Sequence, residues 1–376
     1  MKYKLGDIVP VQQGVVPVAD RYWLLNLDMV ESNTGRIIDY LYVGEDEIGT
    51  STIGFDRNNV LYSKLRPYLN KVVLPTIEGY ATSELLPLRP KTELITREYL
   101  TYFLRSKSFV EYINEKTSGA KMPRANTTDL KAVEIDCPSL EEQKGITEQI
   151  DKIVSIIDKR KQELEELDKL IKSRFVEMFG DSVLNPFDWE QVTLKDVAVD
   201  KLSYGSGASA MEYDGECRYI RITDITGNGE LNNDIKSPDK YDEKYLLHDG
   251  DILFARSGAT VGKTFRYSEE KHGKSIYAGY LIRLVPNKEK VMPDYIFYYT
   301  KTEYYASFVK KVQRAVAQPN INAQEYGNLI ICVPPMELQK EFVTFVEQVN
   351  KSKFEVQKSL DETQLLMDSL MQKYFG

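Results

Sequence analysis

The chain has 376 residues, with 49 Lys and Arg against 57 Asp and Glu, and a formal net charge of −8. This length predicts two domains, and the acidic balance excludes a uniformly basic coat, so any anionic partner must be met by local patches. Three widely spaced cysteines form neither a zinc ribbon nor a disulfide framework, which predicts a reducing cytoplasm. The N-terminus MKYKLGDIVPVQQ has no apolar signal core and no run of 18 apolar residues occurs, so export and membrane insertion are not expected.

The first predicted element is a globular domain, residues 1–138. Within it, residues 57–77 and 116–128 carry basic residues and no acid, and they are interleaved with aromatic and amide side chains. Such side chains hold phosphates and read base edges, although each could equally be a solvated surface charge or a turn residue. The candidates for nucleic-acid contact here are Lys64, Arg66, Lys71, Lys121, Arg124 and Asn126. Asn126 could instead cap the structure that precedes the closing strand.

A long helix is predicted next, at residues 139–179. Ser139 followed by Glu142 is a capping box, and Gly180 stands where a left-handed C-cap belongs. The apolar residues follow a 4-3 heptad spacing that calls for a partner helix. They are Ile146, Ile150, Ile153, Ile157, Leu164, Leu167, Ile171 and Met178, with Arg160 and Arg174 interrupting one seam position.

The second globular domain is predicted at residues 180–334 and contains GDILFARSGATVGKT at 250–264. A phosphate-binding P-loop has four residues between its glycines, whereas Gly258 and Gly262 are separated by three, so the loop is one residue short. The segment aligns with NNVLYSKLRPYLNKV at 58–72, which predicts a strand followed by a basic loop in both domains. In this alignment Lys263 has Lys71 or Arg66 as its counterpart and the glycines have none; a simple β-hairpin turn is an equal alternative.

Acid-free basic stretches recur in the second domain at residues 252–268 and 304–324. They occupy places that match those of the first domain, which makes a chance origin harder to accept than for one such stretch. The candidates for nucleic-acid contact here are Arg256, Ser257, Lys263, Arg266, Arg314, Gln318, Asn320 and Asn322. Asn322, like Asn126, could equally be a cap.

The last predicted element is a second long helix, residues 335–376, which repeats the heptad pattern of the first. Its apolar positions are Phe342, Val346, Val349, Val356, Leu360, Met367, Leu370 and Tyr374, with Lys353 and Thr363 as polar exceptions. Antiparallel pairing of the two helices about a pseudo-twofold axis is the simplest closure, and roughly 40 residues would make a rod of about 60 Å. The alternative is that each helix packs only on its own domain.

The two halves of the chain repeat one another in sequence. PSLEEQK at 138–144 matches PPMELQK at 334–340 with an offset of 196, and the same offset aligns Tyr99 with Tyr295 and Phe179 with Phe375. Upstream the offset falls to about 189, where KLGDIV at 4–9 faces TLKDVA at 193–198. Loops of unequal length explain this drift.

No catalytic constellation is found in the sequence. His248 and His272 lack the spacing of metal-ligand pairs, and the Asn-Pro-Phe at 185–187 lacks the second proline of amino-methyltransferases. The acidic residues near Pro238 lie too close together along the chain for a nuclease metal site. We therefore expect neither an active site nor a metal in this chain.

Taken together, the two matched domains, the motifs PSLEEQK and PPMELQK that open the helices and the Phe-Gly that closes each resemble the DNA-specificity subunit of type I restriction-modification systems. NPFDWEQVTLKDVA at 185–198 and GDILFARSGATVGK are similar to segments of the same family. The resemblance implies an α+β fold: two similar α/β target-recognition domains separated by two long helices that form an antiparallel coiled coil. In contrast to the first helix, the second lacks a serine cap.

The resemblance also implies a function. The chain would read a bipartite, asymmetric site in double-stranded DNA, one domain per half-site, while the helices set the gap. It would be non-catalytic, directing two methyltransferase subunits and restriction/translocase subunits, and S-adenosylmethionine, ATP and Mg would belong to those partners. Two other readings stay open at this point: a stand-alone DNA-binding regulator and a coiled-coil adaptor.

Overall fold

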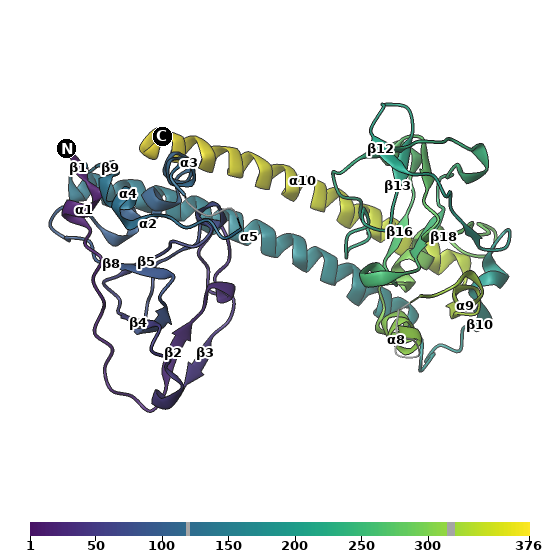
Figure 1. Ribbon diagram of the computed structural model, residues 1–376. Coiled ribbons are helices and arrows are strands. Elements are labelled where there is room, and N and C mark those ends of the chain that lie inside the picture. Colours follow the sequence, from purple (N-terminus) through teal and green to yellow (C-terminus); the bar gives the residue numbers. More distant parts are fainter. Residues whose placement is uncertain (118–120, 314–319) are drawn as a thin grey trace. The chain divides into compact units, whose positions relative to one another are not determined.

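The computed structural model describes residues 1–117, 121–313 and 320–376 and divides into two compact units (Figure 1). The first unit consists of Met1–Lys161 and Gln357–Gly376, and the second of Gln162–Val356. Each unit mixes small sheets with helices, and each of the two long helices contributes one segment to each unit. The predicted α+β fold class is confirmed.

The first unit contains nine strands among the residues that the structure describes. Its strands are β1 (Lys2–Lys4), β2 (Tyr22–Leu25), β3 (Leu41–Val43), β4 (Thr52–Phe55), β5 (Val60–Ser63), β6 (Val72–Val73), β7 (Gly79–Thr82), β8 (Leu85–Leu88) and β9 (Glu134–Asp136). Its short helices are α1 (Leu5–Ile8), α2 (Arg97–Arg105), α3 (Lys107–Glu115) and α4 (Thr127–Ala132), with 3-10 turns at η1 (Leu27–Met29), η2 (Glu45–Glu47) and η3 (Pro67–Leu69).

The strands of the first unit form sheets in the orders β3-β2-β7-β4, β6-β5-β8 and β1-β9. The pairs are antiparallel except for β2 with β7. All four residues of β5 are buried, which explains why apolar side chains stand at three consecutive positions, Val60 to Tyr62, rather than alternating with polar ones. A core of apolar side chains joins β5 to α2 and α3, where Tyr62 packs edge-on against Phe109 at a centroid distance of 5.8 Å.

The second unit repeats this plan with additional elements. Its strands are β10 (Glu190–Thr193), β11 (Ser203–Tyr204), β12 (Ala210–Glu212), β13 (Arg218–Ile220), β14 (Lys236–Pro238), β15 (Ile252–Ala255), β16 (Thr264–Arg266), β17 (Ser275–Tyr277), β18 (Leu281–Leu284) and β19 (Ile330–Val333). Its short helices are α6 (Glu269–His272), α7 (Pro293–Tyr299), α8 (Glu303–Gln313) and α9 (Ala323–Gly327), with 3-10 turns at η4 (Leu194–Val197), η5 (Glu243–Tyr245) and η6 (Gly258–Thr260).

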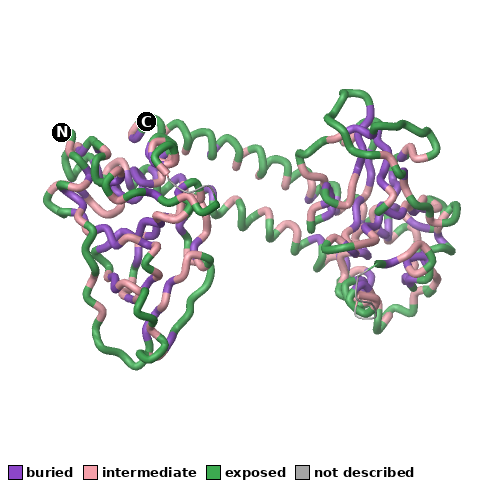
Figure 2. The backbone as a smooth tube through the Cα atoms, in the orientation of Figure 1, coloured by how far each residue is buried: buried purple, intermediate pink, exposed green. Residues whose placement is uncertain are grey.

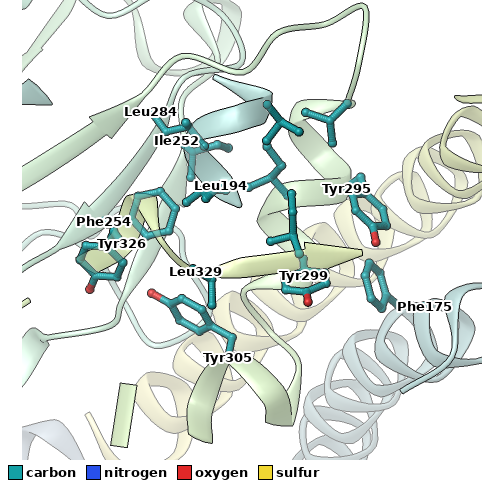
Figure 3. Close-up of a cluster of buried hydrophobic side chains, with 14 of the residues drawn as sticks. Phe175, Leu194, Ile252, Phe254, Leu284, Tyr295, Tyr299, Tyr305, Tyr326 and Leu329 are labelled. Carbon is teal, nitrogen blue, oxygen red and sulfur yellow. The ribbon is translucent and has the colours of Figure 1, made fainter. Parts of the chain in front are cut away.

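The main sheet of the second unit has the order β11-β18-β15-β16, and β12-β14, the parallel pair β13-β17 and β10-β19 complete the unit. Its largest core is rich in aromatic residues (Figure 3). In this core Phe175 stacks on Tyr295 at a centroid distance of 5.4 Å and meets Phe342 edge-on at 5.3 Å. Burial is concentrated on the strands and on the helix segments that cover them (Figure 2).

The internal repeat is visible in strand register. β1 pairs with β9 so that Tyr3 faces Ile135, and β10 pairs with β19 so that Val192 faces Ile331. The first members of these pairs differ by 189 in sequence number and the second members by 196. These are the two offsets of the sequence repeat, so one strand pair closes each unit in the same way.

The two long helices are α5 (Leu140–Phe179) and α10 (Met336–Phe375), each of 40 residues. The predicted capping box at the start of α5 is formed, since the Glu142 N–H donates to Ser139 Oγ (3.2 Å) and the Ser139 N–H donates to the Glu142 carboxylate (2.9 Å). Gly180 has a φ of +77°, the left-handed conformation expected of a glycine that ends a helix.

Within the first unit the helices pair in antiparallel fashion. The Tyr374 hydroxyl donates to Gln149 Oε1 (3.1 Å), and the Arg160 guanidinium donates to the Ser359 carbonyl and the Thr363 hydroxyl. The partner number falls as the α5 number rises, which defines the direction. Arg160 interrupts the apolar seam, yet its charge is satisfied by acceptors of the opposite helix.

Within the second unit the pairing has the same direction. Lys353 Nζ lies 2.6 Å from an Asp168 carboxylate oxygen, and Arg174 lies 3.0 Å from the Glu341 carboxylate. The polar residues that interrupt the apolar seam therefore have partners across it. Both long helices also contribute side chains to the hydrophobic cores of the units. The two alternatives, pairing with each other and packing on the globular domains, therefore occur together.

All twelve residues predicted to pair the helices are at least partly buried. The fully buried ones are Ile150, Ile153, Ile157, Ile171, Val346 and Val349, and the half-buried ones are Leu164, Leu167, Val356, Leu360, Met367 and Leu370. Ile150 belongs to the core of the first unit, and Ile171, Val346 and Val349 belong to the core of the second. Pairing by each of these residues individually stays a prediction.

The glutamine of the repeated motif ties each long helix to its unit. Gln143 is completely buried, accepts from the Thr96 N–H (2.9 Å) and donates to the Leu94 and Pro138 carbonyls (2.8 and 3.0 Å). Gln339 makes the same three bonds in the second unit, to residues displaced by 196 in each case. A side chain with both donors and an acceptor is needed here, because one backbone N–H and two backbone carbonyls would otherwise lose these bonds.

Candidate nucleic-acid interface

Each unit joins a loop that follows a buried strand to a segment that precedes a short helix. In the first unit the Ala125 N–H donates to the Lys64 carbonyl (2.8 Å), and Leu65 forms a bridge with Arg124. In the second unit the Ile321 N–H donates to the Arg256 carbonyl (2.8 Å), and Ser257 forms a bridge with Asn320. The two acid-free stretches of each domain are therefore adjacent, and we call each such pair of segments the basic loop pair of its unit.

The backbone of the two strand-following loops is equivalent. The Lys71 carbonyl accepts from the Ser63 N–H (3.0 Å), and the Lys263 carbonyl accepts from the Ala255 N–H (2.8 Å). This correspondence makes Lys71 the counterpart of Lys263 and aligns Arg66 with Gly258 and Asn70 with Gly262. Of the two counterparts that the sequence alignment left open for Lys263, the structure selects Lys71.

The two glycines have no glycine counterparts in the first unit, as expected, but their left-handed backbone conformation recurs there. Gly258 and Gly262 have φ angles of +67° and +85°, and the equivalent Arg66 and Asn70 both have φ near +49°. The first unit thus adopts the same left-handed turn without glycine, at a cost of roughly 1–2 kcal/mol for a residue such as arginine. The glycines of GDILFARSGATVGKT adopt this turn without that strain.

Lys263 and Lys71 serve the same structural purpose. Lys263 Nζ donates to the Ile225 carbonyl (2.9 Å), and Lys71 Nζ donates to the Leu27 carbonyl (2.6 Å). Burial lowers the pKa of Lys71, and the nearby Asp28 carboxylate partly offsets this. Both ammonium groups are bonded to backbone carbonyls of their own units, and a contact of either lysine with DNA stays an untested prediction.

The two turn glycines differ in the space around them, which gives a stability prediction. A Cβ on Gly262 would lie 2.6 Å from Val309 Cγ1, whereas no described atom lies within 4 Å of a Cβ on Gly258. We expect Gly262→Ala to lower the free energy of unfolding by about 2–3 kcal/mol, from left-handed strain and overpacking together. Gly258→Ala carries the strain alone and should cost about 1 kcal/mol. Urea titration of both variants measures the difference, and equal losses would contradict it.

Other predicted contact residues also have partners within their units. Arg124 lies 3.0 Å from the Glu84 carboxylate, which raises the pKa of the guanidinium, and Arg266 lies 3.1 Å from Asp294. Asn126 and Asn322 cap α4 and α9, accepting from the Thr128 N–H (2.9 Å) and the Glu325 N–H (2.9 Å) respectively. These residues shape the basic loop pairs, and whether they touch DNA is untested.

Three of the cations predicted to contact DNA, Lys64, Arg66 and Lys121, lie in the basic loop pair of the first unit. Arg66 and Lys121 are exposed and Lys64 is half-buried, and none of the three forms an ion pair within residues 1–117, 121–313 and 320–376. Exposed apolar surface accompanies them, since Tyr68 is 52% and Met122 is 47% exposed. Charge and flat apolar surface in one place suit a polyanion with stacked bases.

In the second unit Arg256 and Asn320 occupy the corresponding place. The Arg256 Nε donates to Asn320 Oδ1 (3.2 Å), and the guanidinium carbon lies 4.7 Å from the centre of the Tyr204 ring. Ser257 begins the turn η6 without a side-chain cap bond. Arg314 and Gln318, also predicted to contact DNA, lie outside the described residues.

Tyr204 is the residue at this site that sequence reasoning missed. It stands 52 positions before Arg256 in the sequence and reaches it through the pairing of β11 with β18. The only available signal was the aromatic residue in the Gly- and Ser-rich segment SYGSGAS at 203–209. Periodicity does not reveal such a contact, because it depends on the order of strands in the sheet.

The described part of the chain contains no group of three or more His, Cys, Asp or Glu side chains placed to hold a metal ion. Its three cysteines are buried and unpaired. No described helix is both long enough and apolar enough to cross a bilayer.

Residues 1–169 and 186–363 match the family described as the type I restriction modification DNA specificity domain, and the chain belongs to this family. The specificity subunit of the type I restriction enzyme MjaVIII of Methanocaldococcus jannaschii is 24% identical over 293 residues, which cover 73% of this chain and 68% of that subunit. The StySPI specificity subunit of Salmonella potsdam is 24% identical over 306 residues, covering 76% of this chain but only 65% of that subunit, less than two thirds. The MjaIX specificity subunit of M. jannaschii is 22% identical over 413 residues, covering 98% and 91%.

Solved structures show the same fold over the full length. One, described as the structural basis of complex assembly and conformational transition of the type I R-M system, has a TM-score of 0.62 and 18% identity, covering all of this chain and 97% of that one. The S subunit of the type I restriction-modification system from M. genitalium has a TM-score of 0.57 and 17% identity, covering 100% and 96%. The resemblance seen in the sequence is confirmed.

Proposed function

We propose that each unit reads one half of a bipartite, asymmetric target in double-stranded DNA, and that the chain performs no chemistry itself. The observation that carries this is the basic loop pair, which recurs in both units with the same backbone and different side chains. Lys64 in the first unit takes the place of Arg256 in the second, and Arg124 takes the place of Asn320. Because the same backbone carries different side chains in the two units, each unit would present different hydrogen-bond donors and acceptors to base edges.

The proposed surfaces divide their work between phosphates and bases. The exposed Lys121 and Arg66 and the half-buried Lys64 would hold phosphates of the first half-site, which fixes the register of the unit on the duplex. Residues fixed by side-chain contacts, such as Arg256 and Asn320, would meet base edges. The net charge of −8 does not oppose this, because DNA would meet these local surfaces and not the average of the chain.

The proposed division of the chain is a recognition domain at 1–138, a spacer helix at 139–179, a second recognition domain at 180–334 and a spacer helix at 335–376. Two adenine methyltransferase subunits and the restriction/translocase subunits would assemble on it in the cytoplasm, and they would bring S-adenosylmethionine, ATP and Mg. Membership of the family and the subject of the first structural relative, assembly of a type I complex, support this.

The spacer helices would set the gap between half-sites, and a matched deletion tests this. Asp168 pairs with Lys353, so counting one heptad from this pair in opposite directions along the two helices matches a deletion of residues 161–167 in α5 with a deletion of residues 354–360 in α10. Removing both segments keeps the heptad register and shortens the rod by about 10 Å, or about three base pairs. We expect binding of the assembled complex to its native target to fall by roughly 10³-fold or more, toward the non-specific level.

The target is first identified by sequencing methylated adenines in cells that contain the chain and its partners. Binding is then measured by fluorescence anisotropy with duplexes of different gap lengths. The control replaces Glu165 and Lys358, exposed residues of the same segments, by alanine without changing helix length. Unchanged affinity for the native gap after the double deletion would refute the spacer role, and no preference of the wild-type complex for any duplex would refute recognition itself.

A further inference from the structure

Arg256 is held in one orientation from two sides. Its guanidinium lies on the Tyr204 ring at 4.7 Å, and its Nε–H is used by Asn320 Oδ1 at 3.2 Å. Its backbone is anchored as well, because the Arg256 N–H donates to the Tyr280 carbonyl (3.1 Å) and its carbonyl accepts from Ile321. An arginine with this support loses little side-chain entropy when it binds.

The two supporting residues are themselves fixed. The Ala323 N–H, at the start of α9, donates to the Tyr204 hydroxyl (3.1 Å), and Tyr204 faces Ile282 across the β11-β18 pair. Asn320 forms a backbone bridge with Ser257, the residue that follows Arg256. Three segments that are distant in the sequence therefore converge on one guanidinium group.

These contacts leave the terminal NH₂ groups of Arg256 available to a ligand. With the Nε–H bonded to Asn320 and one face on Tyr204, the two terminal NH₂ groups remain as a pair of parallel donors. In the major groove, guanine presents two adjacent acceptors, O6 and N7, which match such a pair. Resting on the proposed function, we propose that Arg256 reads a guanine in the half-site of the second unit, with Tyr204 and Asn320 as positioning residues.

The first unit lacks this device at the equivalent position. Lys64 replaces Arg256, and a lysine ammonium is a single point charge that cannot make the planar two-donor contact. Arg124 replaces Asn320; its guanidinium group has no acceptor to offer Lys64, and it forms an ion pair with Glu84. The two half-sites would therefore differ at this position, which gives the asymmetric target a structural cause.

The test uses the assembled complex and duplexes in which each base pair of the target is replaced in turn. We expect the wild type to lose about 10- to 100-fold in affinity on replacement of one G·C pair of the second half-site. Arg256→Lys keeps the charge and removes the paired donors, so this penalty should shrink to about twofold while discrimination in the first half-site is retained. Circular dichroism verifies the fold of the variant.

A second variant keeps the inference testable if Arg256→Lys affects folding. Asn320→Ala removes the acceptor for Nε from an exposed position and should reduce discrimination at the same base pair by about 3- to 10-fold. Lys271→Gln, at an exposed position of α6, is the matched control for Arg256→Gln, the variant that removes one positive charge from the site, and should leave discrimination unchanged.

The alternative ligand is a phosphate, which also offers paired acceptors. In that case Arg256→Gln would weaken binding equally for all duplexes and reduce the salt slope by about one, and the proposal would be overturned. It would also fail if Arg256→Lys kept full discrimination at every G·C pair. A wild-type complex without any sequence preference would instead refute the proposed function.

Discussion

Gln339→Ala is expected to lower the free energy of unfolding by about 3 kcal/mol or more. The substitution leaves the Met292 N–H and the Pro334 and Lys290 carbonyls without their partner, and each buried group without a partner costs about 1–3 kcal/mol. Because these groups join the start of α10 to the chain before α7, DNA binding by the second unit should weaken as well. Urea titration followed by circular dichroism measures the loss.

Gln143→Ala should have an effect of the same size in the first unit, since Gln143 makes the same three hydrogen bonds there. The control is Gln162→Ala on the exposed face of α5, where only the contact with Glu166 (3.0 Å) is lost. That change should stay within about 0.5 kcal/mol. Losses below about 1 kcal/mol for both buried glutamines would show that water or backbone shifts replace the bonds.

Phe175→Ala is expected to cost about 3–5 kcal/mol. Phe175 is 2% exposed, and its ring touches Phe179, Tyr295 and Phe342, with centroids 4.9, 5.4 and 5.3 Å away. Figure 3 shows Phe175 beside Tyr295. Loss of the Phe175 ring leaves a cavity where α5 and α10 meet the core of the second unit. Thermal and urea unfolding would measure the effect.

Val176→Ala is the control for this substitution, because the adjacent side chain is 52% exposed and alanine favours the helix. We expect no loss of stability from it. If Phe175→Ala destabilised the protein no more than Val176→Ala, the core of the second unit would not depend on this aromatic cluster.

The repeat and the long helices could be predicted from sequence because their signals depend on residues close together in the chain or on direct similarity between its two halves. Ser139 with Glu142 defines a helix start by a bond between neighbours, and a 4-3 spacing defines the apolar stripe wherever the helix packs. The repeat offsets of 189 and 196 reappear as strand register in β1-β9 and β10-β19. Such features survive without knowledge of the rest of the fold.

The roles of individual basic residues could not be predicted in this way. Lys71 and Lys263 stand in acid-free stretches, as Lys64 and Lys121 do. The ammonium group of Lys71, however, donates to the Leu27 carbonyl, and that of Lys263 donates to the Ile225 carbonyl. What a lysine meets depends on the chain packed against it, which comes from residues about 40 positions away. Composition predicts that a loop is basic but not which way each side chain points.

The sequence alone determined the duplication, the α+β class, the two long helices and the four acid-free stretches that make up the proposed binding surfaces. Tertiary structure alone decided that these stretches meet in pairs, that Arg66 adopts the backbone of Gly258, and that Tyr204 supports Arg256. The physical reason is range: caps and heptads depend on residues a few positions apart, whereas a surface depends on the order of strands that brings distant segments together.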